Sequence, residues 1–97
     1  MFTSNYNMTG FFLAERNELC TDINTYPVTN VDQCSISLID VKKVMPTAVF
    51  KGETDTSMYP AGCYLKTGFL WYNNNQNGPR SHRARQICTT GVYLYNI

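Results

Sequence analysis

The sequence predicts an α+β domain in which one helix packs on a small antiparallel sheet that two disulfides hold together. Three observations lead to this prediction. Four cysteines are far apart in the sequence, at Cys20, Cys34, Cys63 and Cys88, and an even number of widely spaced cysteines in a small chain is typical of a disulfide framework. One stretch places apolar residues at helical spacing. Several short runs are rich in β-branched and aromatic residues, with turn residues between them.

Composition limits both the size of the core and the classes of partner. The 97 residues fit one domain. Hydrophobic residues make up 43% and charged residues 15%, which favours a folded core over disorder, although a core of this size gains much from cross-links. The net charge of +1 provides no field that would attract nucleic acid. No stretch approaches the roughly 20 apolar residues of a membrane span.

The first part of the chain reads as an arm followed by a strand. Residues 1–10 are polar with scattered aromatics, and we expect an N-terminal arm there, followed by a single domain at residues 11–97. Residues 7–9 match a glycosylation sequon, although chance explains this match equally well in a chain rich in Asn and Thr. Residues 11–15 have strong β character and predict a strand. Residues 15–25 are polar and predict a loop that carries Cys20.

A helix is predicted from about Asn30 to Val44. Thr29 is a candidate N-cap, with Asp32 three residues later in a weaker form of the capping box. Pro46 disfavours helical geometry at the residue before it, which ends the helix. Five apolar residues recur at a spacing of three and four and share one helical face: Val31, Cys34, Leu38, Val41 and Met45.

The second half of the sequence predicts strands and turns. Residues 47–51 are a candidate strand, and residues 52–57 a polar loop. Two β-rich runs within 59–73 flank a Lys-Thr-Gly turn, in which Gly68 can take the positive φ of a hairpin loop. Residues 73–79 are a loop by composition, and 80–85 are basic. Residues 86–89 predict a strand, 90–91 a turn and 92–95 a final strand.

The expected topology also predicts how the cysteines pair. Four cysteines allow three pairings. Cys34 projects from the helix toward the sheet, and Cys63 lies in the first strand of the central hairpin, so packing brings these two together. Cys20 and Cys88 remain, and they would join the N-terminal segment to the C-terminal strand. The sequence contains no C-x-x-C pair that would favour a zinc knuckle or a redox site.

The disulfide prediction conflicts with the N-terminal residues. These have neither a basic region nor a long apolar region, so no secretory signal is visible. Three explanations are open: the sequence is a trimmed piece, the protein is exported or packaged without a cleaved signal, or the cysteines are reduced.

Short motifs around the cysteines resemble a known type of module. These motifs lie at Cys20 and at residues 27–34, 59–64, 70–74 and 87–88. Through them the chain is similar to a small cysteine-stapled module of unicellular algae and of the large DNA viruses that infect them, and to PAN/apple domains. This similarity implies a helix stapled to a central strand, joined chain ends, and binding of proteins or carbohydrates without a catalytic centre. Ser35 and Ile36 stand where the algal module usually has Ala-Ala.

No catalytic residue, cofactor or metal site is predicted. His82 is the only histidine, and it lies in a polar, basic loop where nothing nearby in sequence orients it or tunes its pKa. The carboxylates are scattered and do not form a calcium loop or a catalytic pair. We therefore expect a protein that is not an enzyme.

The candidate binding surface combines hairpin aromatics, the Asn-rich loop and the basic segment. Aromatic rings can stack on sugars, and arginines can grip phosphate, sulfated glycan or an acidic protein patch. Alternation places Phe69, Trp71 and Asn73 on one face of the hairpin and Leu70 and Tyr72 on the other, and one of these faces must lie against the helix. The candidate residues are Tyr64, Trp71, Tyr72, Asn73, Asn74, Arg80, Arg83 and Arg85.

Two functions compete. The first is a structural protein, a minor component of a virion capsid or of another large extracellular assembly, whose partners are the other structural proteins. The second is a secreted or surface interaction module that binds carbohydrate or protein through the hairpin aromatics and the Asn-rich loop.

Overall fold

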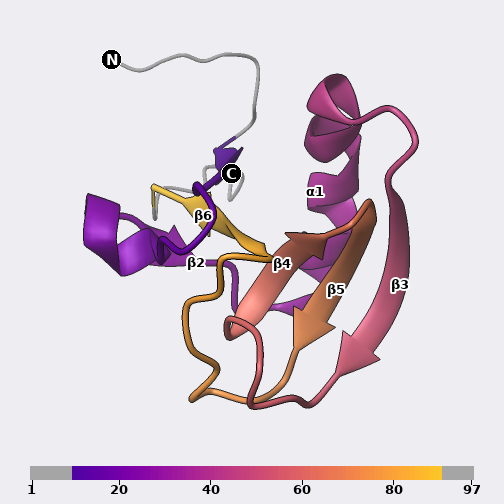
Figure 1. Cartoon of the computed structure of the whole chain (residues 1–97). Helices are drawn as coiled ribbons and strands as arrows, with labels where there is room; N and C mark the ends of the chain where they lie inside the picture. The colour runs from indigo at the N-terminus through magenta and orange to yellow at the C-terminus, as the bar shows by residue number, and fades with distance from the viewer. Residues whose placement is uncertain (1–9, 91–97) are drawn as a thin grey trace.

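The structure is a computed structural model that describes residues 10–90, and it confirms the α+β class. One helix packs on a sheet of six strands. In Figure 1, strands β4 and β5 lie in front of α1. In chain order the elements are β1 (Phe11–Leu13), the 3-10 helix η2 (Cys20–Ile23), β2 (Tyr26–Pro27), α1 (Val31–Val44), β3 (Val49–Thr54), β4 (Gly62–Lys66), β5 (Phe69–Asn73) and β6 (Arg85–Thr89).

The sheet is mixed, which corrects the prediction of an antiparallel sheet. Its strand order is β1-β6-β4-β5-β3, and β2 also pairs with β6. Every pair is antiparallel except β3 with β5, which is parallel. The reason is that β3 does not pair with β4, the next strand in the chain. Instead, β5 lies between β4 and β3 in the sheet, and β3 is the edge strand beside β5.

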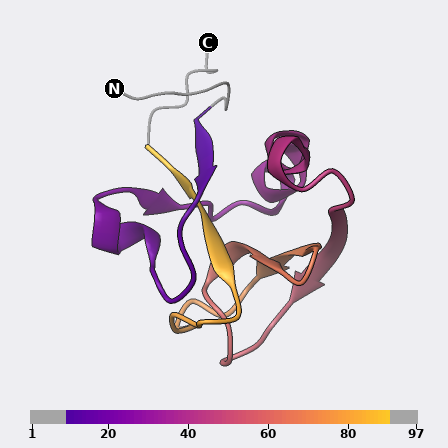
Figure 2. The same ribbon diagram turned by 45° about the horizontal axis from the view of Figure 1, so that its top comes forward.

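The helix follows the prediction in extent but not in its cap. It ends at Val44, and the five predicted apolar residues are buried or pack against the core. The side chain of Asn30, rather than that of Thr29, accepts a hydrogen bond from the backbone N–H of Gln33 at 3.0 Å. Thr29 is one residue too early to reach this N–H, because a cap must immediately precede the first helical residue. Figure 2 shows α1 almost end-on, to one side of the central strands.

Both predicted disulfides are present. Cys34–Cys63 joins α1 to β4, and Cys20–Cys88 joins η2 to β6. All four side chains are fully buried, and the described residues contain no free cysteine. The main core lies between α1 and the sheet, and a smaller cluster forms around the second bridge with Ala14 and Phe12. The buried residues of the main core are Phe11, Val28, Cys34, Val41, Ala48, Cys63, Leu65, Leu70, Tyr72 and Ile87.

The central hairpin is confirmed, and its turn residues explain its geometry. Thr67 and Gly68 have φ values of 48° and 85°, and positive φ at both central residues is typical of a type I′ turn, which matches the twist of the flanking strands. The polar loop predicted from residue 52 was placed too early, because β3 continues to Thr54 by pairing with β5. Strand β2 was not predicted. Residues 1–9 of the arm, the sequon and the strand at 92–95 lie outside the described residues.

Candidate functional site

The sheet has two different faces, and the helix covers only one of them. Leu70 and Tyr72 of β5 belong to the core beneath α1, together with Cys63 and Leu65 of β4. The alternate residues of these strands, and those of β3, point away from the helix. We call this side of β3, β4 and β5 the outer face.

Strand register arranges the outer face in two rows. Lys66, Phe69 and Val49 are cross-strand neighbours in the first row. Tyr64, Trp71 and Gly52 are neighbours in the second. The exposed fractions are 39% for Phe69 and 47% for Val49, which are high for apolar side chains at the middle and edge of a sheet.

Gly52 leaves the space beside Trp71 open. A Cβ atom added at Gly52 would have no heavy atom within 4 Å. The register shifts between Phe50 and Gly52, and Gly52 has a φ of 114°, which side-chain-bearing residues rarely adopt. The half-buried Trp71 therefore has open space at the position of its cross-strand neighbour Gly52.

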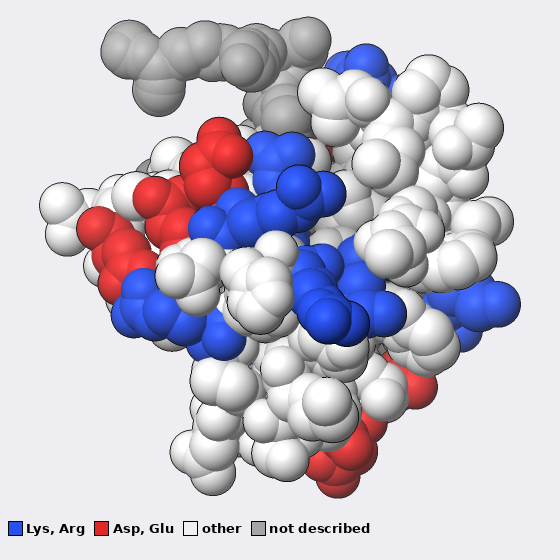
Figure 3. Space-filling model, in the orientation of Figure 1, with Lys and Arg blue, Asp and Glu red and all other residues white. Residues whose placement is uncertain are grey.

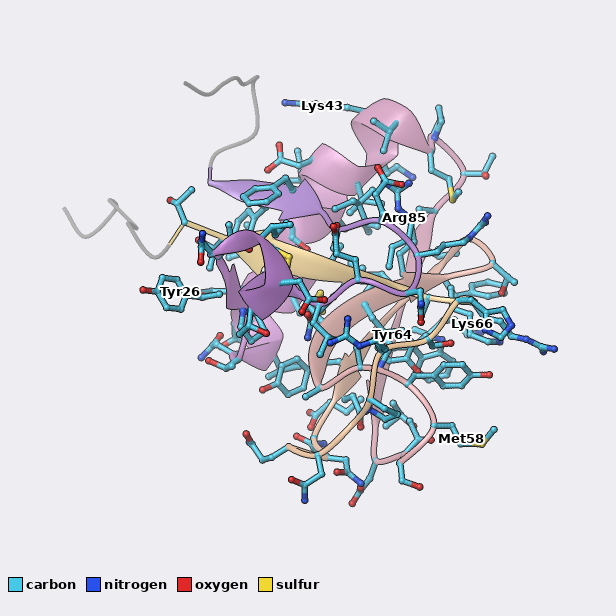
Figure 4. The ribbon with its side chains drawn as sticks, turned by 60° about the vertical axis from the view of Figure 1, so that its left-hand side comes forward. Tyr26, Lys43, Met58, Tyr64, Lys66 and Arg85 are labelled. Carbon is cyan, nitrogen blue, oxygen red and sulfur yellow. A yellow bond between two sulfur atoms is a disulfide. The ribbon has the colours of Figure 1, made fainter. Side chains whose placement is uncertain are left out.

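Two lysines flank the aromatic rings of this face. The Nζ atom of Lys51 lies 5.1 Å from the centre of the Phe69 ring, and that of Lys66 lies 5.2 Å from the centre of the Tyr59 ring. These are cation–π distances. Lys66 projects from the same side of the molecule as Met58, opposite Tyr26 (Figure 4).

Basic side chains form a band across the side of the molecule on which β4 and β5 lie in front of α1. Figure 3, which has the orientation of Figure 1, shows Lys and Arg side chains across the middle of the surface, with acidic side chains to the left and below. Within residues 10–90, the three salt bridges involve neither Lys51 nor Lys66. Both ammonium groups are therefore available to an external anion.

Tyr64 is enclosed on the outer side of β4. The ring of Tyr59 stacks on it, with 5.6 Å between the ring centres. Burial raises the pKa of the Tyr64 phenol to about 12, and the neighbouring Tyr59 adds to the shift. Tyr64, a residue of the predicted binding surface, is only 3% exposed. Because the Tyr59 ring stacks on it, it offers little area to a ligand.

Tyr72 and Asn73 lie where a partner does not reach them. Tyr72 is on the helix side, and burial raises the pKa of its phenol above the usual 10.0. Asn73 shares the face of Phe69 and Trp71, as alternation predicted, but the segment before β4 covers it. Its Nδ2 atom lies 3.0 to 3.1 Å from three carbonyl oxygens, those of Thr56, Tyr59 and Pro60. Asn73 thus anchors a loop.

The three predicted arginines have different surroundings. Arg80 forms a bidentate pair with Asp22 of η2, and this pairing is the main reason why the pKa of Asp22 is lowered. Arg85 donates from Nε to the carbonyl oxygen of Ala14 at 2.8 Å. Arg83 is exposed and forms no salt bridge within residues 10–90. Two of the three arginines are therefore engaged by internal partners, and Asn74 is exposed.

The chemistry-bearing side chains of the described chain are dispersed. His82 is exposed in the loop before β6. Residues 10–90 contain no group of three or more His, Cys, Asp or Glu side chains that could hold a metal ion. No helix among these residues has both the length and the apolar character needed to cross a membrane.

Comparisons with known proteins identify no similar family, sequence or structure. No protein-family model matches, and neither the curated proteins nor the solved structures provide a match. The outer face therefore has to be interpreted from its own geometry.

Sequence reasoning found part of this face. It placed Trp71 in the candidate surface and Phe69 on the same side of the hairpin. It missed Val49, Lys51 and Lys66. The signal for Lys66 was its position next to the turn, directly across from Phe69. Val49 and Lys51 had no such signal, because the parallel pairing of β3 depends on the tertiary fold.

Proposed function

We propose that the chain is a non-enzymatic interaction protein, a minor structural component of a virion or another large extracellular assembly, which it joins through the outer face. The observation that carries this proposal is the exposure of Phe69 and Val49 beside Trp71, on the side of the sheet that no helix covers within residues 10–90. Exposed apolar patches rimmed by charge are typical of interaction sites.

The disulfides support an extracellular setting. Structural disulfides form and persist where the surroundings are oxidising, as on virions and in secreted proteins. The two bridges use all four cysteines of the chain, and all four side chains are fully buried. They hold the outer face on a rigid body, and a rigid surface loses less conformational entropy when a partner binds.

A second candidate is a secreted or surface module that binds carbohydrate. The open space at Gly52 favours it, because Gly52 is the cross-strand neighbour of Trp71 and leaves room there for a ring-shaped ligand. Flat aromatic surfaces offer large contact areas at a small cost in side-chain entropy.

Site-specific photo-cross-linking tests the proposed function. A benzophenone amino acid replaces Phe69 on the outer face, and in a control chain it replaces Ile36, an exposed helix residue that is 55% accessible. Each full-length, disulfide-bonded chain is mixed with extracellular particles from the source cells and illuminated. We expect a discrete adduct with a component of the particles from position 69 only. Equal adducts from both positions, or none from position 69, would contradict the proposal.

A further inference from the structure

The charges of the outer face indicate the chemical class of its ligand. We propose that this face binds a sulfated glycan, with a sugar ring beside the Phe69 and Trp71 side chains and sulfate groups at Lys51 and Lys66. This inference rests on the proposed function, namely that the outer face is the surface that meets a partner.

The apolar part of the face suits a sugar ring. Phe69 is 39% exposed, and Lys66 and Val49 flank it in its row. In the next row the space beside Trp71 is open because Gly52 carries no side chain. A pyranose ring has C–H groups on its faces and hydroxyl groups on its edges. It can therefore cover an aromatic side chain while its polar edges remain in water.

The two lysines add a requirement for negative charge. Each ammonium group lies over an aromatic ring, at 5.1 Å for Lys51 and 5.2 Å for Lys66. Each is therefore partly oriented before a ligand arrives, which lowers the entropic cost of binding. Neither forms an ion pair with a carboxylate among residues 10–90. An anion bound at these positions would not have to displace a carboxylate.

Sulfate fits these lysines better than carboxylate does. Planar carboxylates are matched best by the bidentate fork of arginine, whereas lysine is a compact point charge with three rotatable donors. A sulfate ester presents three oxygens around a tetrahedral centre, and the rotatable donors of a lysine ammonium can approach them from several directions. The one bidentate arginine–carboxylate pair of the described chain, between Arg80 and Asp22, is internal.

The position of the basic side chains on the surface is consistent with a sulfated ligand. The basic band in Figure 3 crosses the surface in the orientation in which β4 and β5 lie in front of α1. Arg83, which is exposed and has no salt bridge among residues 10–90, adds a further cation to the loop before β6. A polyanion longer than one sugar unit can use such a band, and screening by salt would then weaken its binding.

Calorimetry with three matched polysaccharides tests the inference. The full-length oxidised chain is titrated with dextran sulfate, with uncharged dextran and with oligogalacturonate, which carries carboxylates. We expect binding to dextran sulfate that weakens as salt is added, weaker binding to oligogalacturonate and none to dextran. Equal affinity for dextran, tighter binding of oligogalacturonate, or no binding of dextran sulfate would each overturn the proposal.

Paired variants locate the binding. Lys51→Ala combined with Lys66→Ala, and separately Phe69→Ala, should each weaken dextran sulfate binding about tenfold. Lys42→Ala with Lys43→Ala removes the same charge from α1 and should change it less than about twofold. An equal loss in the control pair would mean general charge attraction and would refute the site. Urea unfolding of each variant verifies that it is folded.

The outcomes separate this inference from the proposed function. If dextran sulfate does not bind but position 69 still cross-links to an assembly component, the ligand is not a sulfated glycan and the outer face remains an interaction surface. If position 69 also fails to cross-link, both proposals are wrong.

Discussion

Replacing both Cys34 and Cys63 with alanine removes the bridge between α1 and β4 and should lower the free energy of unfolding by about 3.2 kcal/mol through chain entropy alone. The two residues are 29 positions apart, but the Cys20–Cys88 bridge remains in the variant and already constrains the unfolded chain, so the effective loop is about 17 residues. Closing such a loop removes about 11 cal/mol/K of entropy from the unfolded chain, which gives this value at 25 °C. Because both side chains are fully buried, lost packing adds about 1 kcal/mol.

The Cys20–Cys88 bridge provides the comparison. Its residues are 68 positions apart, but the inner bridge lies within this loop and shortens it by 29 positions, to about 40. Its removal alone should therefore cost about 3.9 kcal/mol of chain entropy, about 0.7 kcal/mol more than removal of the inner bridge. Nesting lowers the cost of each bridge by about 0.5 kcal/mol and leaves the difference between them unchanged.

Urea unfolding at 25 °C, followed through the fluorescence of Trp71, measures both losses. The slope of the transition should increase in each variant, because an unfolded chain with one bridge fewer exposes more surface. A loss below about 1 kcal/mol in either variant would refute the entropic reasoning. So would a cost for the outer bridge that is twice that of the inner one.

Two further predictions concern buried polar groups. Asn73→Ala removes a side chain that is hydrogen-bonded to the segment before β4 and should lower the free energy of unfolding by about 3 kcal/mol. The control Asn74→Ala, at the neighbouring exposed residue, should lower it by less than about 0.5 kcal/mol. Equal urea midpoints for the two variants would contradict this. The raised pKa of Tyr64, about 12, means that the folded chain keeps a proton that the unfolded chain loses above the usual 10.0. The contribution of Tyr64 to the free energy of unfolding should therefore be fully present below pH 10 and be lost between about pH 10 and 12. Tyr64→Phe should reduce this loss, and an unchanged alkaline profile in that variant would show that other groups cause it.

The parts of the fold that depend on local pattern could be predicted from the sequence. Helical spacing identified the buried face of α1, and Gly68 identified the hairpin turn. Once the helix and the hairpin were placed, the pairing of Cys34 with Cys63 followed, and with it the second bridge.

The parts that depend on tertiary contacts could not be predicted. The pattern of residues 52–54, with a glycine and a glutamate, disfavours a strand, yet β5 provides the pairing that extends β3 to Thr54. Alternation gave the direction of the Asn73 side chain correctly, but the loop that buries it crosses from the end of β3. For the same reason the outer face could be predicted at Trp71 but not at Val49 or Lys51.

The nested bridges also change what a protease can do to this protein. A single backbone cut anywhere between Cys20 and Cys88 opens a ring and leaves one covalent molecule, because the bridge still ties both pieces. Residues 74–83, most of which are exposed, are the natural place for such a nick. A nicked chain should keep its mass on a non-reducing gel and separate into fragments only after a reductant is added, so a single cut need not release any part of it.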